Sequence, residues 1–343
     1  MNRIVLSTTF ALAAATSFVT RGAEFTENPN RISLGARFGM NFKAGFRNDG
    51  PFAPSVNPGP VVGAANHTYN DGYVLVDSSG NAGGLTWNWG YQNASQVVGD
   101  TMQFNTIQSS SPSGSSGHEV TSDPQYGAEV TYQRVIGSLP CLGAAHWGLE
   151  AAFGYTDLDL RDNRGGTGPV PVTTDTFQLN GVLPPGPGYA GTFLGPGPLL
   201  GDLPGRTTTS RTASLTSRRR LSGQIFGIRL GPFAEWNLSR QWSFAASVGL
   251  TLAPASVDYD YTESATVAGI GTLAGSGHSS KSALLYGPYA SAVFRFDFNQ
   301  SWGVFVGAQF QHLTDLEQSV GGHSAKLDQG ATIYGVVGVA CKF

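Results

Sequence analysis

The sequence predicts an all-β chain folded as one eight-stranded antiparallel barrel. Eight segments alternate apolar and polar residues with the period of a strand, and the links between them are alternately long and short. Composition agrees, because only 13% of the residues are charged and 47 are glycine. No segment after the N-terminus approaches the roughly 20 apolar residues of a membrane-spanning helix.

Residues 1–23 are predicted to be a signal peptide. Arg3 supplies the positive charge, the stretch from Ile4 to Val19 is apolar, and small residues such as Ala13 and Ser17 offer cleavage sites between about residues 15 and 23. We therefore expect the mature chain to be exported and residues 24–343 to form the barrel.

The predicted strands are marked by strict alternation. In the first, every second residue from Ile32 to Phe46 is apolar, and the residues between them are polar or glycine. Each segment has the roughly 9 to 11 residues that a strand needs to cross a bilayer at a tilt, which predicts a transmembrane barrel. The ranges are Ile32–Phe46, Tyr126–Ile136, Trp147–Leu158, Gln224–Leu238, Trp242–Leu252, Leu284–Phe298, Trp302–Phe310 and Ala331–Phe343.

The links predict how the strands are oriented. Three links are short, at residues 137–146, 237–241 and 299–301. Four are predicted to be long loops rich in Gly, Ser, Thr and Pro, at residues 47–125, 159–222, 253–283 and 311–330. Bacterial outer-membrane barrels have short periplasmic turns and long extracellular loops, so eight strands would place both termini in the periplasm. The alternative, a soluble β-sandwich, would need polar outer faces.

The last ten residues, YGVVGVACKF, end an alternating strand on the aromatic Phe343. This ending resembles the C-terminal signature of Gram-negative outer-membrane proteins, which the barrel-insertion machinery reads. The chain as a whole resembles the small eight-stranded barrels of the OmpA-like and opacity-like type. The resemblance implies a place in the cell outer membrane of a Gram-negative bacterium, with lipid and the insertion machinery as partners. It does not specify an activity.

Charged residues on the inward face form the first candidate site. Their signs nearly balance, and the interior of an eight-stranded barrel is just wide enough for side chains to fill. A salt-bridged plug is therefore favoured over a permeation path, and Lys43 is expected to pair with Glu129. The predicted residues of this network are Arg37, Lys43, Glu129, Glu150, Arg229, Glu235, Arg295 and Asp297.

Two further candidate sites lie in the predicted loops. Arg218, Arg219 and Arg220 are candidates for contact with lipopolysaccharide, because planar guanidinium groups bind phosphate; the alternative is a solvated loop base. Trp87, Trp89 and Tyr91 share one face of a predicted hairpin and are candidates for surface binding. Packing against neighbouring loops is the favoured reading of these aromatics.

The predicted hairpin also holds Asp77 and Asn81, which fall short of a calcium loop. We therefore expect neither a metal nor a cofactor. Cys141 and Cys341 are both expected at the periplasmic rim, and whether they form a disulfide is left open. The net charge of -3 offers no electrostatic basis for binding nucleic acid.

These observations predict a non-enzymatic barrel with a structural or surface-interaction role, such as adhesion or envelope stabilisation, whose extracellular ligand is unknown. The first alternative is a narrow channel for small solutes or ions. The second is a hydrolase that modifies lipid A, because FQHLTDLEQS resembles the His-x-Ser stretch of lipid A deacylases. That chemistry would use His312 and Thr314, for which the sequence identifies no acidic partner.

Overall fold

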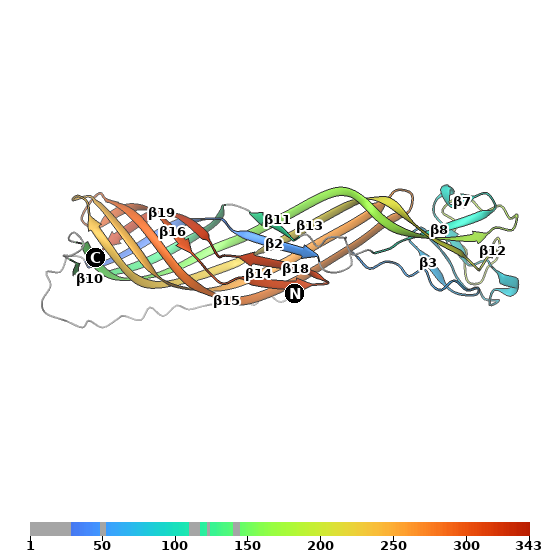
Figure 1. Cartoon of the computed structure of the whole chain (residues 1–343), viewed down its shortest axis with the longest axis horizontal. Helices are drawn as coiled ribbons and strands as arrows, with labels where there is room; N and C mark the ends of the chain where they lie inside the picture. The colour runs from blue at the N-terminus through green and yellow to red at the C-terminus, as the bar shows by residue number, and fades with distance from the viewer. Residues whose placement is uncertain (1–28, 49–52, 110–116, 122–123, 140–144) are drawn as a thin grey trace.

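The computed structural model describes residues 29–48, 53–109, 117–121, 124–139 and 145–343. The predicted signal peptide and Cys141 lie outside these residues. The molecule is elongated, with a barrel of strands at one end and a small unit of short strands at the other (Figure 1). Among the described residues no helix is long and apolar enough to cross a membrane.

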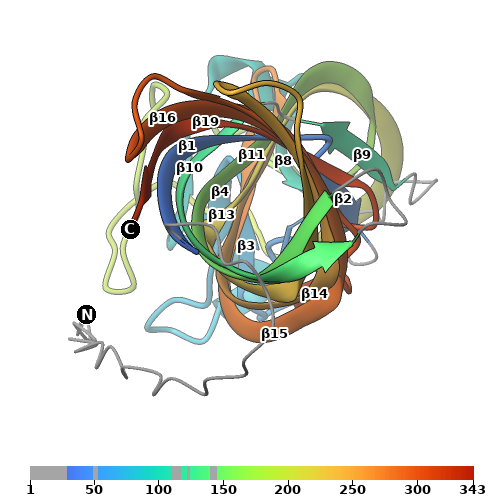
Figure 2. The ribbon, with the colours of Figure 1, turned by 90° about the vertical axis from the view of Figure 1, so that its left-hand side faces the viewer.

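Eight antiparallel strands close into a ring. Their order is β10, β1, β19, β16, β15, β14, β13 and β11, and the pairing of β10 with β11 completes the circle. Figure 2 shows this ring from the end at which the chain terminates. The predicted closed antiparallel barrel is confirmed. Its strands are β1 (Asn30–Met40), β10 (Gln125–Leu139), β11 (Ala145–Gln178), β13 (Gly205–Asn237), β14 (Trp242–Val267), β15 (Gly271–Asp297), β16 (Trp302–Gln311) and β19 (Thr332–Lys342).

An apolar belt surrounds the barrel. On β11 the outward residues run from Trp147 to Tyr155, and on the neighbouring β13 they include Leu230 and Phe226, which pair with Ala151 and Tyr155. The eight steps from Trp147 to Tyr155, at about 3.4 Å each, extend ~27 Å along the strand. At a tilt near 40° this covers most of the roughly 25 Å apolar band of a membrane barrel.

The polarity of the two sheet faces inverts beyond the belt. Along β14 the inward residue Ser247 gives way to Val257 and Tyr259, whereas the outward residue Leu250 gives way to Asp258. The alternation itself continues without a shift, because every odd-numbered residue of β14 stays inward. This inversion is expected of a strand that is surrounded by lipid over one part of its length and by water over the other.

The predicted loops 159–222 and 253–283 are largely strand, which corrects their assignment. β11 continues to Gln178 and β13 begins at Gly205, while only residues 268–270 separate β14 from β15. A composition rich in Ser, Thr and Gly favours loops, but it also suits a strand whose outer face lies in water. We call the parts of β11, β13, β14 and β15 beyond the belt the stalk.

The predicted first strand is interrupted at Asn41, which has a left-handed φ of 63°. Asparagine tolerates this conformation better than most residues. Ala44 and Phe46 then face inward, although the even-numbered residues of β1 face outward. The segment after the break pairs in a second sheet, of order β17 (Leu316–Val320), β18 (His323–Asp328), β2 (Lys43–Asn48) and β9 (His118–Thr121).

This four-stranded sheet covers the lower stalk and encloses an apolar core with it. β9 lies against β11, and β17 lies against β15. The stalk is therefore a sandwich-like continuation of the barrel, and the core directly follows the polar barrel interior. We call this core the apolar cap; it includes Phe42, Ala44, Phe46, Leu158, Leu160, Leu221, Ile225, Val257, Tyr259, Tyr261, Leu285, Leu313, Leu316, Ala325 and Leu327.

Residues 53–107 and 177–205 form the head at the far end of the stalk. It is joined to the stalk where β8 pairs with the C-terminal residues of β11, Val172–Gln178. The predicted hairpin is confirmed, because β4 pairs with β6 through Tyr73 and Gly90. The elements are β3 (His67–Tyr69), β4 (Gly72–Val74), η1 (Ala82–Gly84), β5 (Leu85–Thr86), β6 (Trp89–Tyr91), η2 (Ala94–Gln96), β7 (Val97–Val98), β8 (Thr101–Ile107) and β12 (Leu200–Gly201).

Two alanines on β15 test where the membrane ends. Ala290 and Ala274 are both exposed and even-numbered on one uninterrupted strand, but Ala290 pairs with Val248 inside the belt and Ala274 pairs with Ser264 on the stalk. We expect Ala290→Arg to cost about 2 kcal/mol of unfolding free energy in lipid vesicles, because it places a charge in hydrocarbon. Ala274→Arg should change it by less than about 0.5 kcal/mol. Urea titration measures both, and equal losses would contradict the assigned boundary.

Candidate functional sites

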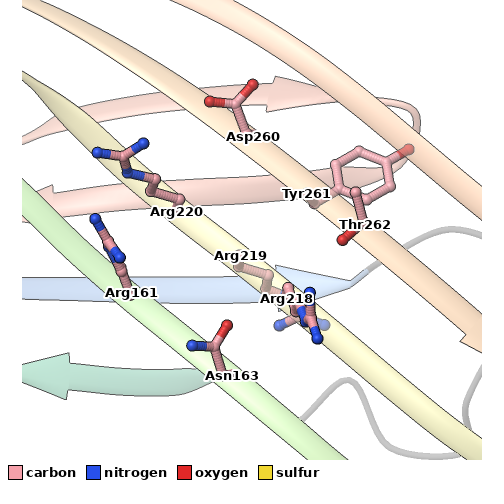
Figure 3. Close-up of a pocket in the computed structure, with 8 residues that line it drawn as sticks. All are labelled: Arg161, Asn163, Arg218, Arg219, Arg220, Asp260, Tyr261 and Thr262. Atoms are coloured by element: carbon pink, nitrogen blue, oxygen red, sulfur yellow. The ribbon is translucent and has the colours of Figure 1, made fainter.

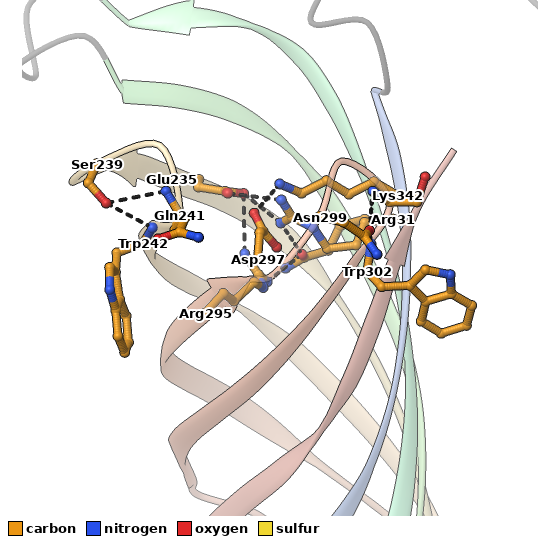
Figure 4. A network of polar contacts seen from close by, with 12 residues as sticks. Arg31, Glu235, Ser239, Gln241, Trp242, Arg295, Asp297, Asn299, Trp302 and Lys342 are labelled. Carbon is orange, nitrogen blue, oxygen red and sulfur yellow. Dashed lines mark hydrogen bonds and ion pairs between the residues drawn. The ribbon is translucent and has the colours of Figure 1, made fainter.

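A charge network begins at the turn rim, the end of the barrel that carries the short turns. Arg31 donates to both oxygens of Glu235, at 2.6 and 2.9 Å. Arg295 contacts the same carboxylate at 3.2 Å, and Lys342 pairs with the neighbouring Asp297. Figure 4 shows these side chains converging from different strands of the barrel. A carboxylate between two guanidinium groups is charge-compensated despite its burial.

Amide and hydroxyl groups continue the network through the middle of the barrel. Gln133 accepts a hydrogen bond from Arg295 at 2.5 Å and donates one to Glu150 at 2.6 Å. The hydroxyls of Ser247 and Tyr289 also donate to Glu150, at 3.2 and 3.3 Å. The middle layer thus joins the carboxylates above and below it.

Glu129 is the centre of the upper layer, nearest the apolar cap. Arg229 donates to it at 2.6 Å, Gln309 donates at 2.8 Å, and Arg37 lies 3.4 Å away. The guanidinium of Arg37 also stacks over the ring of Tyr334, 3.8 Å from its centroid, where the ring quadrupole attracts a cation. All eight barrel strands contribute to the network, and its side chains are almost entirely buried apart from Lys342 and Asp297.

Of the eight residues predicted for this network, the structure brings seven together and leaves Lys43 out. Lys43 lies on β2, beyond the break at Asn41, and its ammonium pairs with Glu119 at 2.8 Å. The predicted pair of Lys43 with Glu129 is therefore wrong. The residues missed by the sequence analysis share the inward parity of those found; they are Arg31, Gln133, Ser247, Tyr289, Gln309 and Tyr334.

The predicted arginine cluster divides between the two faces of the stalk. Arg220 and Arg218 lie on the outer face, beside Arg161 and a hollow of about 470 Å³ (Figure 3). Arg219 points inward and binds the buried Glu263 at 3.1 Å, so it is not available at the outer surface. Glu263 also contacts His323, at 3.0 Å.

Arg161 and Arg220 share one carboxylate, that of Asp159, at 2.6 and 2.8 Å. These two guanidinium groups lower the pKa of Asp159 to about 2, although partial burial acts in the opposite direction. Arg161 follows the last belt residue of β11, Tyr155, by six positions. At about 3.4 Å per residue it lies ~20 Å further along the strand, which at a tilt near 40° is ~15 Å above the belt.

The aromatic residues predicted for surface binding lie mostly inside the head. Trp89 and Tyr91 are buried and stack on each other with ring centroids 6.0 Å apart, while Trp87 is half-buried. Trp89 also packs against Tyr189, 4.8 Å away. These contacts correspond to the favoured alternative, packing against neighbouring segments, and they leave Trp89 and Tyr91 no free face for a ligand.

Residues suggested for hydrolysis do not assemble a catalytic group. The ring of His312 contacts the carbonyl of Gly330, and the hydroxyl of Thr314 accepts a hydrogen bond from the amide of Tyr286. The adjacent Asp315 pairs with Lys326 at 2.7 Å. In the described part of the chain, no group of three or more His, Cys, Asp or Glu side chains is placed to hold a metal ion.

Comparison with known proteins gives no family model and no curated protein that matches. Among solved structures, the chain is similar to the attachment invasion locus protein Ail of Yersinia pestis, at 8% identity over 93% of this chain and 100% of that one, with a TM-score of 0.28. It is also similar to OprG from Pseudomonas aeruginosa, at 9% identity over 92% and 97%, with a TM-score of 0.31. The barrel assignment rests on the strand pairing of this chain itself.

Removing Glu129 tests whether the network is a dry plug. We expect Glu129→Ala to cost about 3 to 5 kcal/mol of unfolding free energy in vesicles, because it leaves Arg37 buried without a carboxylate and Arg229 with only a 3.8 Å contact to Glu150. The control Glu119→Ala breaks the exposed pair with Lys43 and should cost less than about 1 kcal/mol. A similar small loss in both variants would indicate a hydrated interior.

Proposed function

We propose that this chain is a non-enzymatic outer-membrane protein, whose closed barrel anchors a stalk and a head that act in surface interaction or envelope structure. The observation that carries the proposal is the succession of two different seals along one axis. The charge network occupies the barrel within the belt, and the apolar cap follows it within the stalk. A barrel that offers no path for solutes is suited to anchoring a head at the far end of a stalk.

The seals argue against the alternative role as a narrow channel. An ion would first have to separate paired side chains of the network, and then pass a core of Leu, Val, Phe and Tyr side chains that offers it no compensating charge. Hydrolysis of lipid A has less support, because His312 and Thr314 are each engaged with backbone groups. Both therefore remain lower alternatives.

The orientation follows from the same proposal. The stalk and head project from the rim opposite the short turns, and the last strand ends at the turn rim (Figure 1). An outer-membrane barrel with periplasmic turns would carry the head outside the cell and both termini in the periplasm. Phe343 would then be read by the insertion machinery, and the surface abundance of a chain lacking it would test that role.

Single-channel recording tests the proposal directly. The refolded protein in planar bilayers should show no defined conductance steps at neutral pH, while its heat-modifiable migration confirms that the barrel is intact. Glu129→Ala, which loosens one seal but leaves the apolar cap, should also be silent. Regular steps from the unmodified protein would favour the channel instead.

We further propose that the outer arginines bind phosphate groups of lipopolysaccharide. Their height above the belt favours phosphates of the oligosaccharide core over those of lipid A itself. Asp159 neutralises part of the charge of Arg161 and Arg220, which leaves the exposed Arg218 as the principal contact. Guanidinium groups suit this role because they bind phosphate through paired hydrogen bonds.

Arg218→Gln should weaken binding of rough lipopolysaccharide to the protein in nanodiscs by about three- to tenfold, the loss expected for one charge-assisted contact. The matched control is Arg240→Gln, which removes an exposed arginine in the turn at residues 237–241. Lipopolysaccharide with a dephosphorylated core should bind both variants equally. A loss that is the same with and without core phosphate would contradict the assignment.

A further inference from the structure

The head has almost no charge on its surface. Residues 53–107 and 177–205 include no lysine or arginine and only four carboxylates. Asp71, Asp77 and Asp202 are buried, and Asp100 is the one charged side chain of these ranges that is exposed. Surfaces of exported proteins usually owe their solubility to many charges. A head without them is suited to a partner that is itself apolar or uncharged.

The buried carboxylates are occupied by structural hydrogen bonds. Asp77 accepts from the amide and hydroxyl of Ser79, at 2.9 and 2.6 Å, and from the amide of Asn81 at 3.2 Å. Burial alone would raise the pKa of Asp77, but these bonds outweigh it and the pKa is lowered. Asp202 accepts from the amide of Ala64 at 2.8 Å. Both residues therefore shape the turn at residues 77–84 and are not free to bind a ligand.

Exposed apolar side chains gather around this turn. Leu194, Leu203 and Phe193 are 78%, 61% and 54% exposed. The carbonyl of Phe193 accepts from the amide of Ser78 at 2.8 Å. Leu203 follows Asp202, whose carboxylate joins segment 61–64 to the same place. We call this surface the apolar tip and define it as Val61, Val62, Phe193, Leu194 and Leu203.

The tip is held in place from below. The indole nitrogen of Trp87 donates to the carbonyl of Phe193 at 3.3 Å, and Gly195 has a left-handed φ of 63°. A side chain at Gly195 would meet the Trp87 ring at 2.9 Å, so glycine permits the loop to lie directly on the indole. The apolar side chains are thus presented by a supported loop.

Leu183 provides a contrast on the same head. It is 90% exposed, but its segment is fixed elsewhere, because the amide of Gly181 donates to Asp100 at 2.8 Å and the carbonyl of Pro185 accepts from Tyr91. Leu183 is therefore an exposed leucine outside the apolar tip. It supplies a matched control for general hydrophobic adhesion.

We propose that the apolar tip inserts into the surface of a lipid bilayer other than the one that holds the barrel. Leucine and valine side chains on separate turns suit fluid acyl chains, whereas protein hot spots favour Trp, Tyr and Arg and seldom use Leu. Sugars are disfavoured because Trp89 and Tyr91 are buried. The head lies at the opposite end of the long axis from the barrel (Figure 1), which excludes the barrel's own membrane.

The proposal rests on the outward presentation of the head inferred above. It also predicts how binding depends on the charge of the lipid. The tip has neither basic residues to attract anionic lipid nor exposed acids to repel it. Binding should therefore be independent of anionic lipid and of salt, because only burial of apolar surface drives it. Aliphatic insertion of this kind is also reversible.

Flotation with phosphatidylcholine vesicles tests the proposal, using the full chain in nanodiscs. The unmodified protein should float with the vesicles, and Leu194→Ser with Leu203→Ser should lower its affinity by about tenfold or more, since burying one leucine contributes about a factor of ten. Leu183→Ser should bind as the unmodified protein does. Heat-modifiable migration shows that each variant keeps its barrel, independently of tip binding.

Four results would overturn the proposal. They are no flotation of the unmodified protein, flotation that requires anionic lipid or is lost in high salt, an unchanged double variant, and an equal loss in Leu183→Ser. Association of the protein with itself in detergent micelles, where no second bilayer is offered, would identify a second copy of the chain as the partner and would also overturn the proposal. A silent barrel in conductance recordings would leave the anchoring role intact in each of these cases.

Discussion

The polarity of the two faces inverts along single strands of this protein, as expected for a strand that passes from lipid into water. Within the belt the outward residues must be apolar and the inward ones can be polar; in the stalk the requirement is reversed. The chain meets both demands on β14 and β15 without a change of alternation, and on the first strand by a break at Asn41. The residue types along each strand therefore indicate the position of the bilayer.

The inversion also accounts for how the interior is closed. Polar inward residues inside the belt have no solvent to meet, so they pair with one another across the barrel, with Glu235, Glu150 and Glu129 as successive acceptors. Beyond the belt the inward residues become apolar and pack as a conventional core. Charge pairing and apolar packing are unlike in kind, yet both leave little room for solute. The closed axis is a consequence of the alternation being kept while the medium changes.

The long strands of the closed barrel also provide mechanical support for the head. β11 and β13 pair over more than thirty residues, from the turn rim to the head, so the head is carried by the same hydrogen-bonded ladder that crosses the membrane. Such a ladder resists bending more than a flexible loop would. The exposed side chains differ along this ladder, with arginines on the stalk near the barrel and an uncharged apolar surface at the far end.

The barrel could be predicted from the sequence, because alternation over about ten residues is a local signal that needs no knowledge of the partner strand. The sequence also placed seven inward charges, since parity is a local property. Three features became clear only in the folded chain: Lys43 lies outside the network, Arg219 points inward, and the Ser- and Thr-rich links are strands. The position of Lys43 depends on the left-handed conformation of Asn41. The character of the links depends on whether lipid or water lies outside a strand, because the composition of a water-facing strand resembles that of a loop. The gathering of Val62, Leu194 and Leu203 at one tip likewise depends on contacts between segments more than a hundred residues apart.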